Sequence, residues 1–253
     1  MEFENKVVLI TGASSGIGRA IAKDLSKKEV KLALIARRED LLNEISPGNK
    51  NILRIKCDVS NKIQVSEAYS KIIEKFGKID IAILNAGYSV RMTAEDFDSG
   101  LAEKIYGANV FGIIYWVEQL LPAFIERKEG MIAGVSSLAD TKGYSKSGFY
   151  SSSKAAVTIY LEGLSSELRK YNIKVINVRP GFVRTPMTDK NEFEMPLLME
   201  PEKAARIILN GMRKEKRKIQ FPWQLVLLTN LLRFVPNSLF EILEQKRLKK
   251  YED

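Results

Sequence analysis

Short apolar runs alternate with longer segments of mixed character along most of the chain. The apolar runs predict strands at residues 7–10, 32–36, 52–57, 79–84, 131–135 and 174–178. Segments with helical periodicity lie between them, at 17–28, from 39 onward, and at 62–76, 96–128 and 150–171. The run at 79–84 is apolar nearly throughout, which is typical of a parallel strand covered on both faces.

The pattern changes in the last quarter of the chain. Pro201, followed by Glu202, predicts the start of a helix, because proline and acidic residues suit the first helical turn. A short strand is expected at 219–221. Residues 222–253 form a C-terminal helical extension in which Pro236 interrupts an otherwise apolar stretch.

Strand–helix–strand alternation predicts βαβ units and therefore an α/β fold. We expect a doubly wound, Rossmann-like parallel sheet of about seven strands with helices on both faces. No linker rich in proline, glycine or serine interrupts the sequence, so residues 1–253 are expected to form one domain. In such sheets ligands bind at the carboxyl ends of the strands, so functional residues should follow the strands directly.

The amino-acid composition excludes several kinds of catalytic and metal-binding site. The chain has no histidine, which excludes Ser-His and Cys-His nucleophilic catalysis and every histidine-containing metal site. Its single cysteine, Cys57, excludes an intramolecular disulfide and fits a half-buried strand thiol. No metal is expected. Acid–base chemistry would have to use tyrosine, lysine, carboxylates or bound water.

The chain is basic, with a formal charge of +9, and much of the excess follows residue 200. Basic chains include proteins that bind nucleic acids or anionic membranes. The sequence contains no recognisable nucleic-acid-binding motif, so no nucleic-acid partner is expected. The N-terminus resembles no signal peptide, and no run approaches the ~18 apolar residues of a membrane span. We therefore expect a cytoplasmic protein.

A glycine-rich turn follows the first predicted strand and opens the first helix. It reads Thr11-Gly12-Ala13-Ser14-Ser15-Gly16-Ile17-Gly18. Glycines let a backbone approach a pyrophosphate closely, and the helix N-terminus supplies free N–H groups to the phosphates. The spacing Gly-x-x-x-Gly-x-Gly departs from the Gly-x-Gly-x-x-Gly dinucleotide fingerprint, although its position between strand and helix is the same.

Further short motifs occur in a fixed order along the chain. They are Asp58-Val59, Asn85-Ala86-Gly87, Asn109-Val110-Phe111-Gly112, Ser136-Ser137, Tyr150-Ser151-Ser152-Ser153-Lys154 and Asn177-Val178-Arg179-Pro180-Gly181, with Thr185 a few residues on. Each alone has a structural explanation as a turn or a solvated helix face. With the glycine-rich turn, their order and spacing resemble the short-chain dehydrogenase/reductase family over about residues 5–185.

The resemblance implies a catalytic set of Asn109, Ser137, Tyr150 and Lys154. Tyr150 and Lys154 are four residues apart on one predicted helix, so they share a face. A nearby ammonium favours the phenolate, so we expect the pKa of Tyr150 to be lowered. Ser137 can hydrogen-bond a substrate oxygen. By resemblance, Lys154 also holds the nicotinamide ribose, and Asn109 completes a water-linked proton relay.

The resemblance also implies the cofactor contacts. In the family the acidic residue after the third strand contacts the adenine, and the Asn-Ala-Gly motif borders the cofactor. The cofactor-binding residues expected here are Gly12, Ser14, Ser15, Gly16, Ile17, Gly18, Arg37, Arg38, Asp58, Val59, Asn85, Ala86, Gly87, Tyr150, Lys154, Pro180, Gly181, Val183 and Thr185.

The end of the second strand bears on the choice of nicotinamide. An NAD site carries an acidic residue there for the ribose 2′-hydroxyl, but this chain has Ala36 followed by Arg37 and Arg38. A guanidinium can grip a 2′-phosphate. We expect NADP(H) rather than NAD(H), with Arg37 as the main discriminator and Arg38 in support. The alternative is two ordinary surface arginines.

The substrate pocket is expected where the loop after residue 135 meets a lid at 182–200. Its predicted lining is Leu138, Tyr144, Phe149, Phe182 and Met187. These apolar residues favour a hydrophobic substrate, and packing of the lid onto the body explains them equally well. The C-terminal extension has three open interpretations: it covers its own pocket, binds another subunit, or touches an anionic membrane peripherally.

The leading functional hypothesis is an NADP(H)-dependent oxidoreductase acting on a hydrophobic ketone, aldehyde or secondary alcohol. Within enzymes, the alternative is a 3-oxoacyl-carrier-protein reductase whose basic surface docks an acidic carrier. Outside the enzymes, the alternative is a nucleotide-sensing protein that binds NADP(H) without turnover. The family resemblance also suggests a homodimer or homotetramer through the helices at 96–128 and 150–171.

Overall fold

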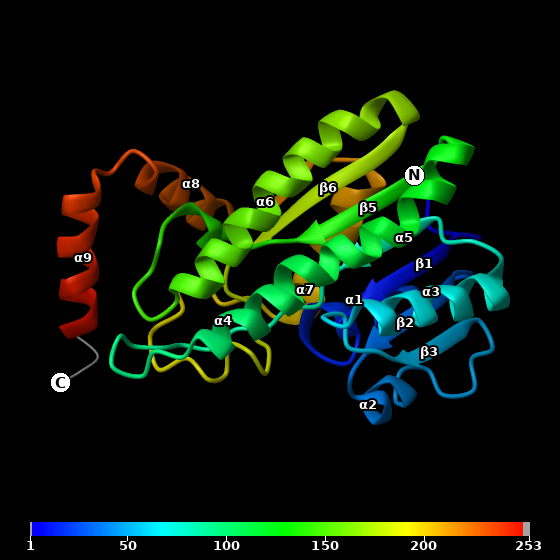
Figure 1. Cartoon of the computed structure of the whole chain (residues 1–253), viewed down its shortest axis with the longest axis horizontal. Coiled ribbons are helices and arrows are strands. Elements are labelled where there is room, and N and C mark those ends of the chain that lie inside the picture. Colours follow the sequence, from blue (N-terminus) through cyan, green and yellow to red (C-terminus); the bar gives the residue numbers. More distant parts are fainter. Residues whose placement is uncertain (1, 250–253) are drawn as a thin grey trace.

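The computed structural model describes residues 2–249. Seven parallel strands form one sheet in the order β3-β2-β1-β4-β5-β6-β7. The strands are β1 Val7–Thr11, β2 Lys31–Ala36, β3 Ile52–Lys56, β4 Ile81–Leu84, β5 Gly130–Val135, β6 Ile173–Pro180 and β7 Lys218–Phe221. The predicted α/β fold with a doubly wound parallel sheet is confirmed (Figure 1).

Helices cover both faces of this sheet. In chain order they are α1 Gly16–Leu25, α2 Glu39–Asn43, α3 Lys62–Phe76, α4 Ser99–Tyr106, α5 Gly112–Arg127, α6 Gly148–Leu168, α7 Pro201–Arg213, α8 Trp223–Leu232 and α9 Asn237–Lys249. A π-helical segment at Gly107–Phe111 joins α4 to α5, and short 3-10 helices occupy Leu138–Thr141 (η2) and Arg169–Tyr171 (η3).

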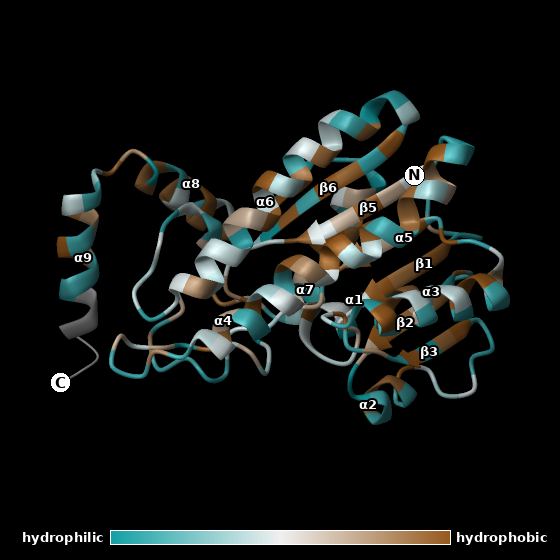
Figure 2. Cartoon of the chain, in the orientation of Figure 1, coloured by the Kyte–Doolittle hydropathy of each residue, from teal (hydrophilic) through white to brown (hydrophobic). Residues whose placement is uncertain are grey.

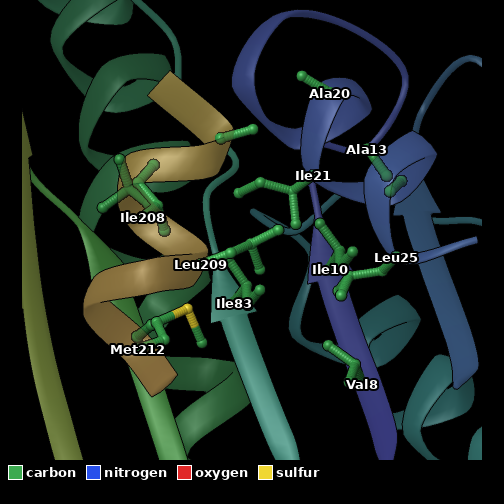
Figure 3. Close-up of a cluster of buried hydrophobic side chains, with 14 of the residues drawn as sticks. Val8, Ile10, Ala13, Ala20, Ile21, Leu25, Ile83, Ile208, Leu209 and Met212 are labelled. Atoms are coloured by element: carbon green, nitrogen blue, oxygen red, sulfur yellow. The ribbon is translucent and has the colours of Figure 1, made fainter. Parts of the chain in front are cut away.

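Alternation along the strands divides the core into two layers. Val8 and Ile10 of β1 point into the layer formed with α1 and α7, whereas Val7 and Leu9 point into the layer formed with α3, α5 and α6. Figure 3 shows Val8, Ile10 and Ile83 packed beneath α1 and α7. β1 and β2 are accordingly hydrophobic along most of their length (Figure 2).

The expected helix at 96–128 is a composite. It begins at Ser99 because the carboxylate of Asp98 accepts from the N–H of Gly100 at 2.8 Å and caps the first turn. The π-helical segment around Asn109 then interrupts regular hydrogen bonding before α5. The helical periodicity of apolar residues continues through this segment, so the sequence predicts one uninterrupted helix at 96–128.

The same composite, Ser99–Arg127, is long and apolar enough to cross a membrane by length and composition alone. We had expected no such segment, because scattered polar residues break its apolar runs while its average hydropathy stays high. Trp116, Leu120 and Phe124 are nevertheless buried against the sheet. We interpret it as a core helix, since such helices pass the same test.

The switch in strand order positions the site. β1 lies between β2 and β4, so the chain leaves β1 toward one side of the sheet and later crosses to the other. At such a point the connections diverge and leave a crevice at the carboxyl ends of the strands. The glycine-rich turn follows β1, and Asn85 follows β4, so both lie at this crevice.

Candidate active site

The turn between β1 and α1 is shaped for a ligand that approaches the backbone. Gly12 and Gly16 have φ angles of +68° and +55°, which favour glycine. A Cβ on Gly18 would lie 2.4 Å from the carbonyl oxygen of Gly12, so only glycine lets α1 start so close to the turn. No side chain caps α1 at Ser15, which leaves N–H groups of its first turn for an anion.

The loop after β4 is tied to this turn. Thr11 Oγ1 accepts from the N–H groups of Asn85 and Ala86 at 2.9 and 3.0 Å. The Asn85 amide donates to the carbonyl of Thr11 at 3.1 Å. These bonds hold the ends of β1 and β4 together. The Asn-Ala-Gly motif therefore has the structural role expected of it, while its contact with a cofactor remains a prediction.

A cavity of about 230 Å³ runs along the carboxyl ends of the strands. Its lining includes most of the predicted cofactor residues: Gly12, Ser14, Ser15, Gly16, Ile17, Arg38, Asn85, Ala86, Gly87, Tyr150, Lys154, Pro180, Gly181, Val183 and Thr185. Ser137 and Met187 also line it, together with Val135, Ser136, Pro186 and Thr188, which were not among the predicted site residues. Residues distant in sequence thus form one continuous cleft, and its glycine cradle fits a dinucleotide.

A larger hollow, of about 770 Å³, lies elsewhere. It is bounded by the end of the lid, the start of α7 and the β7–α8 junction at Trp223. Neither Ser137 nor Tyr150 lines it. We place the chemistry in the smaller cleft, because that cleft holds the acid–base groups.

Three of the predicted catalytic residues meet inside the cleft. Ser137 stands between β5 and η2, and its hydroxyl is hydrogen-bonded to the phenol of Tyr150 on α6. Lys154, one turn further along α6, is only 4% exposed, and its ammonium donates to the carbonyl of Val135 at 2.9 Å. The same ammonium lies 5.7 Å from the centre of the Tyr150 ring.

Burial dominates the protonation of this pair. It lowers the pKa of Lys154 to about 8. The nearby carboxylate of Asp140 opposes this shift, because it favours the charged ammonium. Burial raises the pKa of Tyr150; the hydrogen bond from Ser137 lowers it and Asp140 raises it further. The expected lowering of the Tyr150 pKa is therefore wrong for the protein alone, because desolvation of the phenolate outweighs the hydrogen bond from Ser137.

Asn109 lies beside this group but is fully bonded to protein. Its amide nitrogen donates to Tyr88 O at 3.0 Å and to Ser153 Oγ at 2.9 Å, and its oxygen accepts from Tyr88 N at 2.7 Å. The side chain thus fixes the loop after β4 against α6. Both groups of the side-chain amide are already hydrogen-bonded to these partners. A water-linked relay through Asn109 stays a prediction.

The two candidate arginines lie in different places. Arg38 donates to Ser15 Oγ at 2.9 Å and to Ser14 Oγ at 3.3 Å, which puts its guanidinium on the glycine-rich turn. The Arg37 side chain is 69% exposed and approaches Asp58 at 3.9 Å. Both arginines lie between the end of β2 at Ala36 and the start of α2 at Glu39, and only Arg38 contacts the glycine-rich turn. Which of them discriminates between the cofactors stays a prediction.

Asp58 and Val59 lie outside the residues that line the cleft. Asp58 accepts from the N–H and hydroxyl of Ser60 at 3.0 and 2.7 Å, which shapes the turn before α3. Val59 is buried, and a Cβ on Gly112 would lie 2.8 Å from its side chain. Val59 therefore has a packing role at the start of α5, and the adenine contact of this motif remains a prediction.

The expected substrate pocket is only partly assembled. Met187 lines the cleft, whereas the buried Leu138 is not among its lining residues. The three aromatic residues pack on neighbouring segments instead: Phe149 on Phe97, Phe182 on Phe193 and Tyr144 on Phe240. Phe182 and Phe193 both belong to the lid at 182–200, so their contact lies within the lid.

The C-terminal extension packs on the loop that follows η2. Lys142 donates to Val235 O at 3.0 Å and to Asn237 Oδ1 at 2.9 Å, and the N–H of Ser145 donates to Glu244 at 3.1 Å. Tyr144 meets Phe240 edge-on, with ring centres 5.8 Å apart. The extension therefore packs on the loop at 142–145, and the choice among the three interpretations stays a prediction. Its residues 250–253 lie outside the described part of the chain.

Sequence reasoning assigned no role of their own to Asp140 and Arg179, which form an ion pair directly behind the catalytic group. A signal was present in the sequence. Arg179 interrupts the apolar strand over 173–180, whose other residues are mostly buried. A charge in a strand covered on both faces requires a partner.

Comparison with known proteins identifies the family. The family model described as "short chain dehydrogenase" matches residues 6–195 of the chain. The chain belongs to the short-chain dehydrogenase family. It is 32% identical over 244 residues to an uncharacterized oxidoreductase of Myxococcus xanthus, covering 95% of this chain and 96% of the relative. The short-chain dehydrogenase assignment makes the protein an oxidoreductase with a nicotinamide cofactor, as the sequence motifs predicted.

Two further relatives are named for a substrate class. A 3-oxoacyl-[acyl-carrier-protein] reductase of Thermotoga maritima is 32% identical over 236 residues, covering 83% of this chain and 91% of the relative. The structure of a 3-ketoacyl-(acyl-carrier-protein) reductase of Brucella melitensis, complexed with NADH, matches with a TM-score of 0.79. It is 26% identical and covers 87% of this short-chain dehydrogenase and 96% of its own chain.

Proposed function

We propose that this protein is an NADP(H)-dependent oxidoreductase that interconverts a hydrophobic carbonyl compound and its secondary alcohol. One observation carries the proposal. The cleft that contains Ser137, Tyr150 and Lys154 continues to a glycine-rich turn on which Arg38 rests. A guanidinium at that turn can pair with a 2′-phosphate, which NAD lacks.

Each residue of the cleft has a distinct task in the reduction. A nicotinamide held on the glycine-rich turn would supply hydride chemistry, while the protein supplies position and a proton. Ser137 donates a hydrogen bond to the substrate oxygen and holds it toward Tyr150. The phenol of Tyr150 then delivers the proton to that oxygen as it becomes the alcohol. Lys154 lies within the same cleft, where its ammonium stabilises the resulting phenolate.

The substrate class is proposed from the surroundings of the cleft. Met187 lines it, and the apolar loop and lid close to it favour a hydrophobic carbonyl compound. The relatives named for 3-oxoacyl-carrier-protein reduction make that reaction the second candidate, in which the basic surface would receive an acidic carrier. A non-catalytic nucleotide sensor is less favoured, because sensing alone requires no acid–base set.

The deciding experiment is a fluorescence titration with NADPH and NADH, followed by turnover on methyl ketones of increasing chain length. We expect tighter NADPH binding and turnover that rises with chain length. Tyr150→Phe should lower turnover by about 10²- to 10⁴-fold with cofactor binding retained. A 3-oxoacyl thioester reduced far better than the ketones would favour the second candidate. Cofactor binding without turnover on any carbonyl would favour the sensor.

A matched pair of variants tests the cofactor preference. Arg38→Asp should weaken NADPH binding about 10- to 100-fold more than NADH binding, because a charge-assisted bond is lost and a repulsion added. Arg37→Asp is the control, since Arg37 is exposed and directed toward Asp58. Equal losses for both cofactors in Arg38→Asp would contradict the assignment to NADP(H).

We also propose a cytoplasmic homodimer or homotetramer that contacts membranes peripherally. The family resemblance supports oligomerisation. The membrane contact is supported by α8, whose outer side chains are largely apolar and exposed. Light scattering coupled to size-exclusion chromatography measures the oligomeric state, and a monomeric mass would contradict this part of the proposal.

A further inference from the structure

Asp140 and Arg179 form an ion pair that is closed to solvent, with side-chain exposures of 0% and 3%. Arg179 Nε donates to Asp140 Oδ2 at 2.7 Å, and Nη2 donates to Oδ1. Thr158 on α6 donates to the same carboxylate. One carboxylate therefore joins η2, β6 and α6, three elements that meet behind the cleft.

This ion pair is connected to the catalytic residues on both sides. Ser137 begins the segment that contains Asp140, and Thr158 lies one turn beyond Lys154 on α6. Ser136 bridges the two: its hydroxyl donates to the carbonyl of Lys154 at 2.8 Å and lies 2.8 Å from Thr158 Oγ1. A change in the pair would move the Ser137 segment relative to α6.

A purely stabilising role accounts poorly for this arrangement. A buried ion pair gives little net stability, because desolvation of both charges offsets their attraction. Asp140 does act on the catalytic groups, since its charge raises the pKa of both Tyr150 and Lys154. One pair thus fixes the geometry behind the cleft and balances the charge there.

We propose that Asp140 and Arg179 are positioning residues for the proposed reaction: they hold Ser137 against the Tyr150–Lys154 helix and balance the charge behind them. Only the expected effect on turnover rests on the proposed function. Neither residue lines the cleft, so both act through Ser137, Tyr150 and Lys154.

The charged surroundings of the pair are simple within the described residues. β5 carries no charged side chain, and the charges of α4, which packs on α6, are Glu103 and Lys104, both exposed. Lys142, which follows η2, is bonded to Val235 and Asn237, and Arg233, which follows the neighbouring α8, is exposed. Among these groups, Asp140 acts on the pKa of both Tyr150 and Lys154, and Arg179 is its ion-pair partner.

Neutralising Asp140 and neutralising Arg179 should shift the ionisation midpoint of Tyr150 in opposite directions. A nearby carboxylate disfavours the phenolate and favours the ammonium, whereas a nearby guanidinium does the reverse. Asp140→Asn leaves the guanidinium unopposed, so the ionisation midpoint of Tyr150 should fall. Arg179→Gln leaves the carboxylate unopposed, so the midpoint should rise. A role confined to packing would produce no such pair of opposite shifts.

The test is an ultraviolet titration of phenolate absorbance, which needs neither substrate nor turnover. Each variant is compared with the same variant carrying Tyr150→Phe, so that the difference reports Tyr150 among the nine tyrosines. We expect midpoints to increase in the order Asp140→Asn, the double variant Asp140→Asn with Arg179→Gln, wild type, and Arg179→Gln, spanning about one pH unit or more. Arg179→Lys, which keeps the charge, should lie near wild type.

Equal midpoints, or shifts of the same sign in Asp140→Asn and Arg179→Gln, would overturn the proposal. If Arg179→Gln fails to fold, the order of Asp140→Asn, the double variant and wild type still decides it. The pH profile of NADPH-dependent ketone reduction should shift in the same directions. Failure of the proposed function would appear instead as absent NADPH binding or turnover in the wild type, while the titration would remain informative.

Discussion

Lys154 places a positive charge where water barely reaches. Its ammonium has one hydrogen bond, to Val135, and its pKa falls from 10.5 to about 8 because burial disfavours the charged form. Each pKa unit corresponds to about 1.4 kcal/mol, so retaining this charge costs the folded protein about 3 kcal/mol below pH 8. A functional requirement explains why a lysine is kept at this position.

The cost of this charge predicts how stability depends on pH. Between pH 8 and 10.5 the unfolded chain binds the Lys154 proton and the folded protein does not, so stability rises with pH in that window. Lys154→Met should therefore be more stable than wild type by about 2 kcal/mol at pH 7, after loss of one hydrogen bond. Urea denaturation at pH 7 and pH 10 should find the advantage largely gone at pH 10. A variant destabilised equally at both pH values would contradict the buried ammonium.

At the scale of elements, the glycines of α1 and α6 perform different tasks. Gly18 allows α1 to begin against the turn after β1, because any Cβ there would meet the Gly12 carbonyl. Gly163 lies in the interior of α6 with nothing within 4 Å of a Cβ. The first glycine is required by packing, whereas the second only adds flexibility to the unfolded chain.

These two glycines form a matched pair for mutation. Gly18→Ala should lower the free energy of unfolding by about 1–3 kcal/mol through overpacking and should also weaken cofactor binding. Gly163→Ala should raise it by up to about 1 kcal/mol, because alanine favours the helix. Urea denaturation and cofactor titration measure both effects. A neutral Gly18→Ala would mean that α1 can move away from the turn at little cost.

For the whole molecule, the C-terminal arm is the least enclosed part. Figure 1 shows α9 standing away from the sheet, attached through α8. Trp223 and Phe234 are 71% and 85% exposed, and Leu227, Leu228 and Leu231 of α8 are each more than half exposed. Soluble monomers rarely expose so large an apolar patch, so a further surface is expected to cover it.

We expect that surface to be a lipid bilayer, because apolar helices with aromatic and basic residues bind at the membrane interface. The protein should float with vesicles that contain anionic lipid, and Trp223→Ser with Phe234→Ser should abolish flotation. Ile63→Ser is the control, since Ile63 is also 70% exposed but lies on α3. Dissociation of an oligomer by the double variant, without any effect on vesicles, would identify a subunit interface instead.

Much of the fold and of the site followed from the sequence. Strands such as β2 and β4 are apolar because both faces are covered, and this burial leaves a pattern in the sequence itself. Ser137, Tyr150 and Lys154 follow strands or share a helix face, so local geometry alone brought two of them together. The π-helical segment at Asn109 and the packing of Tyr144 on Phe240 left no such local pattern.

What the sequence determined by itself was the alternation of strands and helices, the glycine-rich turn and the acid–base residues, because each depends on neighbours in the chain. Tertiary structure decided which arginine lies on the turn, how burial shifts the pKa of Tyr150 and Lys154, and that Asp140 meets Arg179. These outcomes depend on distances between segments far apart in sequence and on the exclusion of water. Both arise only when the sheet and its helices pack together.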